Sequence, residues 1–84
     1  MDKLIKKIQK KLGGKVVRIT MQSHNLGFGF ETVGIVLMDN GGLNNYSTHK
    51  VYVNDDAFGM EHGNYDMDAY ESAIDYFARV KSLD

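Results

Sequence analysis

The stretch Phe28-Gly29-Phe30-Glu31-Thr32-Val33-Gly34-Ile35-Val36-Leu37-Met38-Asp39 decides the fold. It is the longest apolar run in the chain and is rich in β-branched residues. Gly27 precedes it and Asn40-Gly41 follows it, and such residues favour turns. The stretch therefore predicts the central strand of a small sheet, on which the other elements pack.

The spacing of apolar residues predicts one helix at each end of the chain. Residues 2–12 carry leucine and isoleucine at helical spacing, with lysines on the opposite side. Residues 67–82 show a second helical pattern, in which Asp68 and Glu71 have the spacing of a capping box. Asp66 is a competing cap, which would set Tyr65 against Tyr70 as a hydrophobic staple.

Two further segments alternate as strands do, namely residues 15–23 and 45–54. Residues 54–65 are acidic and contain glycine, which predicts a loop. The order helix, three strands, helix predicts one α+β domain over residues 1–84, with a three-stranded antiparallel meander between the helices. The predicted core is Leu4, Ile8, Leu12, Val17, Ile19, Met21, Val33, Ile35, Leu37, Val51, Val53, Tyr70, Ile74 and Phe77.

Both helices are expected on one face of the sheet, which would give two layers and leave the other face uncovered. That face would expose aromatic and basic side chains, which are common at interface centres. Three interpretations of this face are open. It binds a protein partner, it forms the interface of a dimer, or the first helix packs on it and the domain has three layers. The predicted sheet-face interface is Phe28, Phe30, Tyr46, Tyr52, Arg18 and Lys50.

The composition is that of an ordinary globular domain: 84 residues, 43% hydrophobic and 25% charged. The absence of cysteine excludes disulfides and thiolate metal sites. No apolar run approaches the ~20 residues of a membrane span, and the start of the chain lacks a signal-peptide pattern. We expect a cytoplasmic location in the host cell.

Basic and acidic residues are segregated along the chain. Residues 1–42 hold seven Lys or Arg against three acids, a net +4, whereas residues 43–84 hold three against eight, a net −5. A concentrated acidic surface can imitate a phosphate backbone and occupy a basic groove of another protein, although acids also gather at helix N-termini for the helix dipole alone. The predicted partner-binding residues are Asp55, Asp56, Glu61, Asp66, Asp68, Glu71, Asp75, Tyr65 and Tyr70.

No catalytic, cofactor-binding or metal-binding pattern is present. His24, His49 and His62 are scattered, each without an obvious carboxylate relay. The acidic residues around position 55 miss the spacing of a calcium loop. We therefore expect no enzyme, no cofactor and no metal.

Leu26-Gly27-Phe28-Gly29-Phe30-Glu31-Thr32-Val33 resembles the RNA-binding strand motif of RRM domains, which implies stacking of bases on the two phenylalanines. Leu26, Glu31 and Val33 depart from that motif. The element order is also similar to double-stranded-RNA-binding domains, but Asp66–Glu71 stands where that family carries lysines and would repel phosphate. Direct nucleic-acid binding is therefore not expected, and a nucleic-acid-binding sheet face remains an alternative.

As a whole, the order of elements is similar to that of some anti-CRISPR proteins, and residues 63–79 resemble the tails of short phage proteins. The resemblance implies a partner that is a nuclease effector, blocked sterically. The leading hypothesis is a non-enzymatic inhibitor that binds the basic surface of a nucleic-acid-processing complex. A homodimeric structural or regulatory phage protein is a further alternative.

Overall fold

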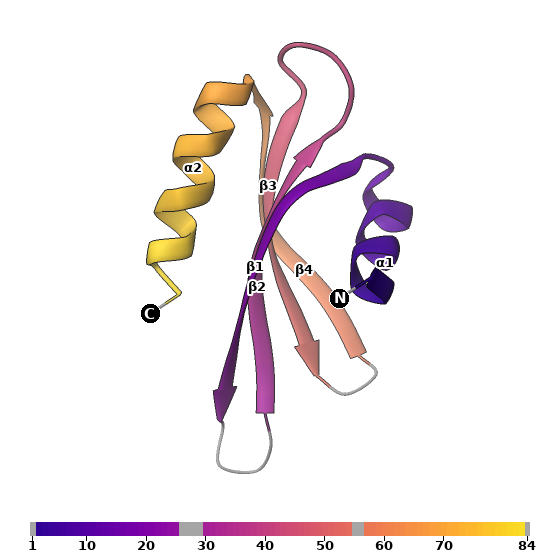
Figure 1. The fold of residues 1–84 in the computed structure, drawn as a ribbon, viewed down its shortest axis with the longest axis vertical. Helices are drawn as coiled ribbons and strands as arrows, with labels where there is room; N and C mark the ends of the chain where they lie inside the picture. Colours follow the sequence, from indigo (N-terminus) through magenta and orange to yellow (C-terminus); the bar gives the residue numbers. More distant parts are fainter. Residues whose placement is uncertain (1, 26–29, 55–56, 84) are drawn as a thin grey trace.

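The computed structural model describes residues 2–25, 30–54 and 57–83, which form two helices and four strands (Figure 1). Within these residues, no helix is both long and apolar enough to cross a membrane. In chain order the elements are α1 (Asp2–Leu12), β1 (Lys15–Asn25), β2 (Phe30–Asp39), β3 (Tyr46–Asn54), β4 (Ala57–Met67) and α2 (Ala69–Lys81).

The strands form one antiparallel sheet in the order β1-β2-β3-β4. The predicted α+β class, with terminal helices flanking an antiparallel meander, is confirmed. The loop predicted over residues 54–65 is wrong, because most of that segment belongs to β4, which pairs with β3 from Ala57 to Met67. Phe58 and Met60 alternate there with Gly59 and Glu61, a strand pattern that the acidic and glycine content obscured.

The helices lie on opposite faces of the sheet, so the domain has three layers (Figure 1). On one face, Val33, Ile35 and Leu37 of β2 pack with residues of α2. On the other face, Val36 and Met38 pack with Ile8 of α1. The prediction of both helices on one face is wrong, and the three-layer alternative describes the structure.

The register of β2 against β3 explains this difference. Val36 pairs with His49 and Leu37 pairs with Thr48. Even-numbered residues of β2 therefore share a face with odd-numbered residues of β3. The predicted uncovered face combined residues that lie on opposite sides of the sheet, because a shift by one residue exchanges the two faces of a strand.

A β-bulge changes the facing of β1. The register shifts between Val16 and Arg18, and Val17 between them is 50% exposed. Val16 instead packs against the α1-side cluster with Ile19 and Met21. The core position predicted for Val17 is therefore wrong, since the extra residue of a bulge is left outside the regular alternation.

Gly34 lies at the centre of β2, where a methyl group has no room. A Cβ atom there would lie 2.8 Å from the backbone oxygen of Thr20 and would overlap the side chain of Met21. We predict that Gly34→Ala lowers the free energy of unfolding by about 1–3 kcal/mol, as overpacking does. Urea denaturation measures this. Gly59→Ala is the matched control, because a Cβ atom at Gly59 meets no atom within 4 Å; equal effects of the two substitutions would contradict the close approach.

Asp68 caps the N-terminus of α2, which confirms the predicted capping box. Its carboxylate accepts a hydrogen bond from the Glu71 amide at 2.7 Å, and the Glu71 carboxylate accepts one from the Asp68 amide at 3.2 Å. We predict that Asp68→Ala lowers the free energy of unfolding by about 1 kcal/mol, whereas Asp68→Asn, which keeps a capping acceptor, changes it little. Thermal or urea unfolding of both variants checks this, and an equal loss in both would assign the effect to charge rather than to capping.

Candidate functional site

Three large apolar side chains lie exposed along one stripe of α2. Tyr70, Ile74 and Phe77 are 76%, 55% and 51% exposed. Their spacing of four and three residues places them on one face of the helix. The core positions predicted for these three residues are therefore wrong. We call Tyr70, Ile74 and Phe77 the α2 crest.

The opposite side of α2 faces the sheet with a mixture of apolar and polar groups. Tyr76 and Leu83 are buried in the cluster formed with the apolar residues of β2. The Tyr76 hydroxyl shares a hydrogen bond with the hydroxyl of Thr20 on β1. Ser72 is fully buried, and its hydroxyl donates to the Ala69 carbonyl at 2.9 Å. The buried side of α2 therefore contains Tyr76, whose hydroxyl is hydrogen-bonded, in place of the more hydrophobic Ile74 and Phe77 that were predicted there.

A polar clamp of Thr48, Asn64, Asp75 and Arg79 holds α2 in this rotation. The fully buried Thr48 hydroxyl donates to the Asp75 carboxylate and accepts a hydrogen bond from the Arg79 guanidinium at 3.2 Å. The Asn64 amide donates to both carboxylate oxygens of Asp75, at 3.1 and 3.2 Å. Rotating the helix to bury the crest would separate these groups, and buried polar groups without partners are costly. The clamp therefore keeps the crest turned toward solvent.

A hollow of about 430 Å³ lies between the crest and the β1 side of the sheet. The half-exposed Val17 lines it, and the Arg18 guanidinium lies 5.9 Å from the centre of the Phe77 ring. We call this hollow the crest groove. Its lining is Val17, Arg18, Leu37, Asp39, Tyr46, Ala69, Ser72, Ala73, Tyr76 and Phe77.

The predicted partner-binding acids are divided between several places. Asp66, Asp68 and Glu71 lie at or before the start of α2, on the same helical end as Tyr70. Asp75 instead faces the sheet, in the polar clamp. Glu61 lies on β4, where it accepts a hydrogen bond from the Tyr52 hydroxyl. Asp55 and Asp56 lie outside the described residues.

The remaining predicted tyrosine, Tyr65, is exposed on the other side of the sheet. Its ring contacts His49 edge to face, with 5.1 Å between the ring centres. The structure therefore brings Tyr70 together with three acids but does not bring Tyr65 to the same place.

Four of the predicted sheet-face residues lie under or beside α2, namely Arg18, Tyr46, Lys50 and Tyr52. Tyr52 packs against the α2-side cluster, and the Lys50 amine lies 5.5 Å from the centre of its ring. Arg18 and Tyr46 line the crest groove. Phe28 lies outside the described residues, and of Phe30 only the backbone is described, pairing with Asn25.

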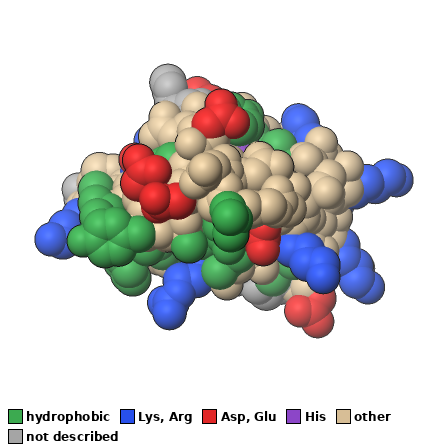
Figure 2. Space-filling model, turned by 90° about the horizontal axis from the view of Figure 1, so that it is seen from above, with side chains coloured by type: hydrophobic (Ala, Val, Ile, Leu, Met, Phe, Trp, Pro, Cys, Tyr) green, Lys and Arg blue, Asp and Glu red, His purple; other side chains and the backbone are tan. Residues whose placement is uncertain are grey.

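Most lysines of the chain lie on α1. Figure 2 shows blue Lys and Arg side chains concentrated on the side where α1 lies, with others on the α2 side, where hydrophobic side chains are prominent. The exposed lysines of α1 are Lys3, Lys6, Lys7, Lys10 and Lys11.

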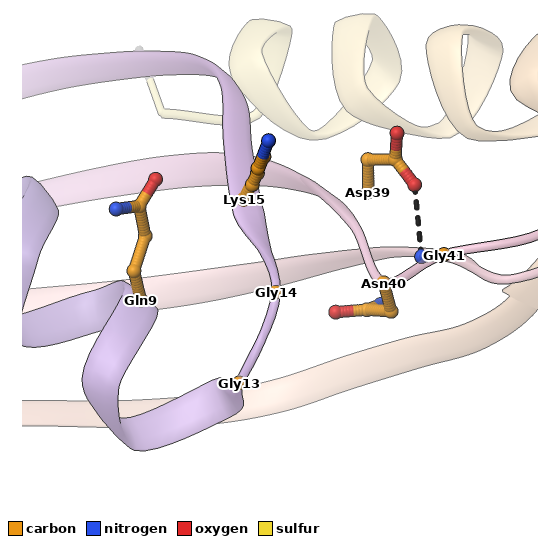
Figure 3. Close-up of a pocket in the computed structure, with 7 residues that line it drawn as sticks. All are labelled: Gln9, Gly13, Gly14, Lys15, Asp39, Asn40 and Gly41. Atoms are coloured by element: carbon orange, nitrogen blue, oxygen red, sulfur yellow. Dashed lines mark hydrogen bonds between the residues drawn. The ribbon is translucent and has the colours of Figure 1, made fainter.

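Two further hollows lie on the side of the sheet covered by α1. The hollow between α1 and the β2–β3 turn is about 580 Å³ and open. Figure 3 shows that its side chains do not converge on one point, and a hydrogen bond joins the Gly41 amide to the Asp39 carboxylate at 2.9 Å. A hollow of about 290 Å³ lies against His49 and Tyr65. Within the residues that the structure describes, no three His, Cys, Asp or Glu side chains gather as metal ligands do.

His49 is buried beneath α1, with only 3% of its surface exposed. Its Nε2 atom lies 2.9 Å from the Ser47 hydroxyl, which accepts a further hydrogen bond from the Asn40 amide at 2.8 Å. Burial, and next the positive charge of Arg79, lower the pKa of His49 below its ordinary value of 6.5. The ring is therefore held neutral as part of the packed interior.

Sequence-based reasoning missed the exposure of Ile74, Phe77 and Val17. The sequence did contain a signal for which face of α2 turns toward the sheet. Ser72, Asp75 and Arg79 recur at helical spacing and form a second stripe, whose side chains can form hydrogen bonds with the sheet. No comparable signal marked the bulge at Val17.

Comparison with known proteins gave no match among family models, curated proteins or solved structures.

The neutral state of His49 has a consequence for stability. Because its folded pKa is lowered, the unfolded chain binds more protons below pH 6.5, so the contribution is present above pH 6.5 and is lost as pH falls through the folded pKa. We predict that the free energy of unfolding of the wild type falls more steeply below pH 6.5 than that of His49→Gln. Urea denaturation at several pH values measures the difference between the two proteins. Parallel pH profiles would contradict a buried, neutral His49.

Proposed function

We propose that this protein is a non-enzymatic interaction module that binds another protein through the α2 crest and the crest groove. The observation that carries the proposal is the exposure of Tyr70, Ile74 and Phe77 on a helix whose other side packs on the sheet through Tyr76 and Val80. Exposed apolar patches bordered by polar groups are typical of protein-binding surfaces.

The shape of this surface suits a protein rather than a small molecule. The crest side chains extend outward from α2 into solvent. The crest groove beside them is shallow, because two of the residues that line it, Val17 and Phe77, are themselves about half exposed. Aromatic residues and arginine, here Tyr70, Phe77 and Arg18, are the side chains most enriched in the energetic centres of interfaces. Fully covering one such apolar side chain contributes about 1.5–3 kcal/mol.

The charges beside the crest indicate the chemistry of the partner. Asp66, Asp68 and Glu71 lie at the same end of α2 as Tyr70. A complementary surface would offer an apolar pocket with lysine or arginine at its rim. Basic surfaces of this kind are found on proteins that bind nucleic acid, which supports the proposal that the protein acts as an inhibitor, covering the basic surface of a nucleic-acid-processing complex.

The experiment is capture of the partner from cells of the encoding organism, followed by reconstitution with the purified partner. We predict that Ile74→Glu lowers the affinity at least tenfold, because it places a charge at the centre of a desolvated apolar contact, where each 1.4 kcal/mol is a factor of ten. Leu43→Glu is the matched control, because Leu43 is 88% exposed in the β2–β3 turn, away from the crest. Calorimetry or interferometry with the reconstituted pair measures all three affinities.

Equal binding by both variants would contradict the proposal, as would a failure to capture any protein that rebinds when purified. The oligomeric state is measured in parallel. If the wild type forms a dimer that Ile74→Glu dissociates, the crest is an interface between two copies, and the proposed partner protein is overturned.

A further inference from the structure

The lysine face of α1 is a second candidate surface, separate from the α2 crest. It consists of Lys3, Lys6, Lys7, Lys10 and Lys11, all exposed, and Asp2 is the one acid in the helix. At 100° per residue these lysines share one side, while Leu4, Ile8 and Leu12 pack against the sheet. Among the described residues none of these lysines pairs with a carboxylate; Lys11 alone has a charge contact, over the Phe58 ring at 5.6 Å.

This arrangement carries a repulsion that the fold does not relieve. Lys3, Lys7 and Lys11 follow one another four residues apart, as do Lys6 and Lys10. Each like-charge pair at this spacing destabilises a helix by about 0.2–0.5 kcal/mol. A polyanion placed along the face would neutralise several lysines together.

The three-layer fold keeps the acids at the start of α2 away from such a ligand. α1 and α2 lie at opposite ends of the intermediate dimension of the molecule, which spans 26 Å in Cα positions (Figure 1). At about 0.1 M salt the Debye length is about 10 Å, so exposed charges this far apart are largely screened from each other. A phosphate chain on the α1 face therefore experiences the lysines and not the acids at the start of α2.

We propose that the lysine face of α1 binds the phosphate backbone of double-stranded nucleic acid without reading its sequence. From Lys3 to Lys11 the helix rises about 12 Å, and each strand of a duplex presents one phosphate per 3.4 Å of its axis, so several phosphates come within reach of the row. The apolar face of α1 is used inside the domain, where Ile8 is completely buried, so the helix has no apolar side left to insert into a lipid surface. A duplex is therefore favoured over a membrane as the occupant.

The test is binding of the full chain to a fluorescent DNA duplex of about 20 base pairs, and to an RNA duplex of equal length, over a series of salt concentrations. With three to five phosphates engaged, the slope of log K against log salt is expected near −3 to −4.5. The variant Lys7→Gln/Lys10→Gln should bind roughly tenfold or more weakly at low salt, with a slope about 1.8 less steep. Gln is nearly as good a helix former as Lys, so this variant is expected to fold.

The matched control is Lys50→Gln/Lys81→Gln, which removes the same charge from the side of the sheet that faces α2. Undiminished duplex binding by the control, with the expected loss in the α1 variant, supports the proposal. No binding at low salt, or equal losses in both variants, overturns it. Vesicles containing anionic lipid form a further arm, and lysine-dependent binding to vesicles without duplex binding also overturns it. No crest residue is altered, so the result is independent of the proposed partner protein.

Discussion

The fold depends on the two-sided burial of β2. Val36 and Met38 point to one face of the sheet and are completely buried, while Ile35 and Leu37 point to the other and are almost so. A strand with apolar residues on both faces requires a cover on each, because half of these side chains would otherwise remain in water. One helix is available at each end of the chain, so α1 and α2 are placed on opposite sides. The separation of the lysines of α1 from the acids at the start of α2, and hence of the two candidate surfaces, follows from this single requirement.

The two sides of α2 differ in how they are held. Tyr76, with Leu83 just after the helix, supplies the apolar contact with the sheet, and the clamp formed by Thr48, Asp75 and Arg79 supplies its direction. Apolar contact alone would tolerate rotation of the helix toward Ile74 and Phe77, since hydrophobic burial is not directional. Hydrogen bonds among buried groups are directional and costly to break, so they select one rotation. The polar groups thus specify which apolar side chains stay outside.

The sequence predicted those features that depend on local pattern. Both helices, the central strand, the capping box at Asp68 and the antiparallel order are properties of contiguous residues. The predictions were wrong where a feature depends on contacts between segments that are far apart in the sequence. The facing of β3 relative to β2 depends on a one-residue register, the exposure of Val17 depends on a bulge, and the crest depends on hydrogen bonds between Thr48 and a helix 27 residues later. β4 was missed because its alternation is short and its composition resembles that of a loop.

The fold determines where the basic and acidic residues of the chain lie on the surface. Along the chain, the basic and acidic halves could attract each other, and packing both helices on one face would have brought them together. The sheet instead stands between them, and its interior layers are apolar clusters on either side of β2. α1 consequently presents its lysines to solvent on one side of the sheet, and Asp66, Asp68 and Glu71 lie at the start of α2 on the other side, so the two groups of charge compensate each other little.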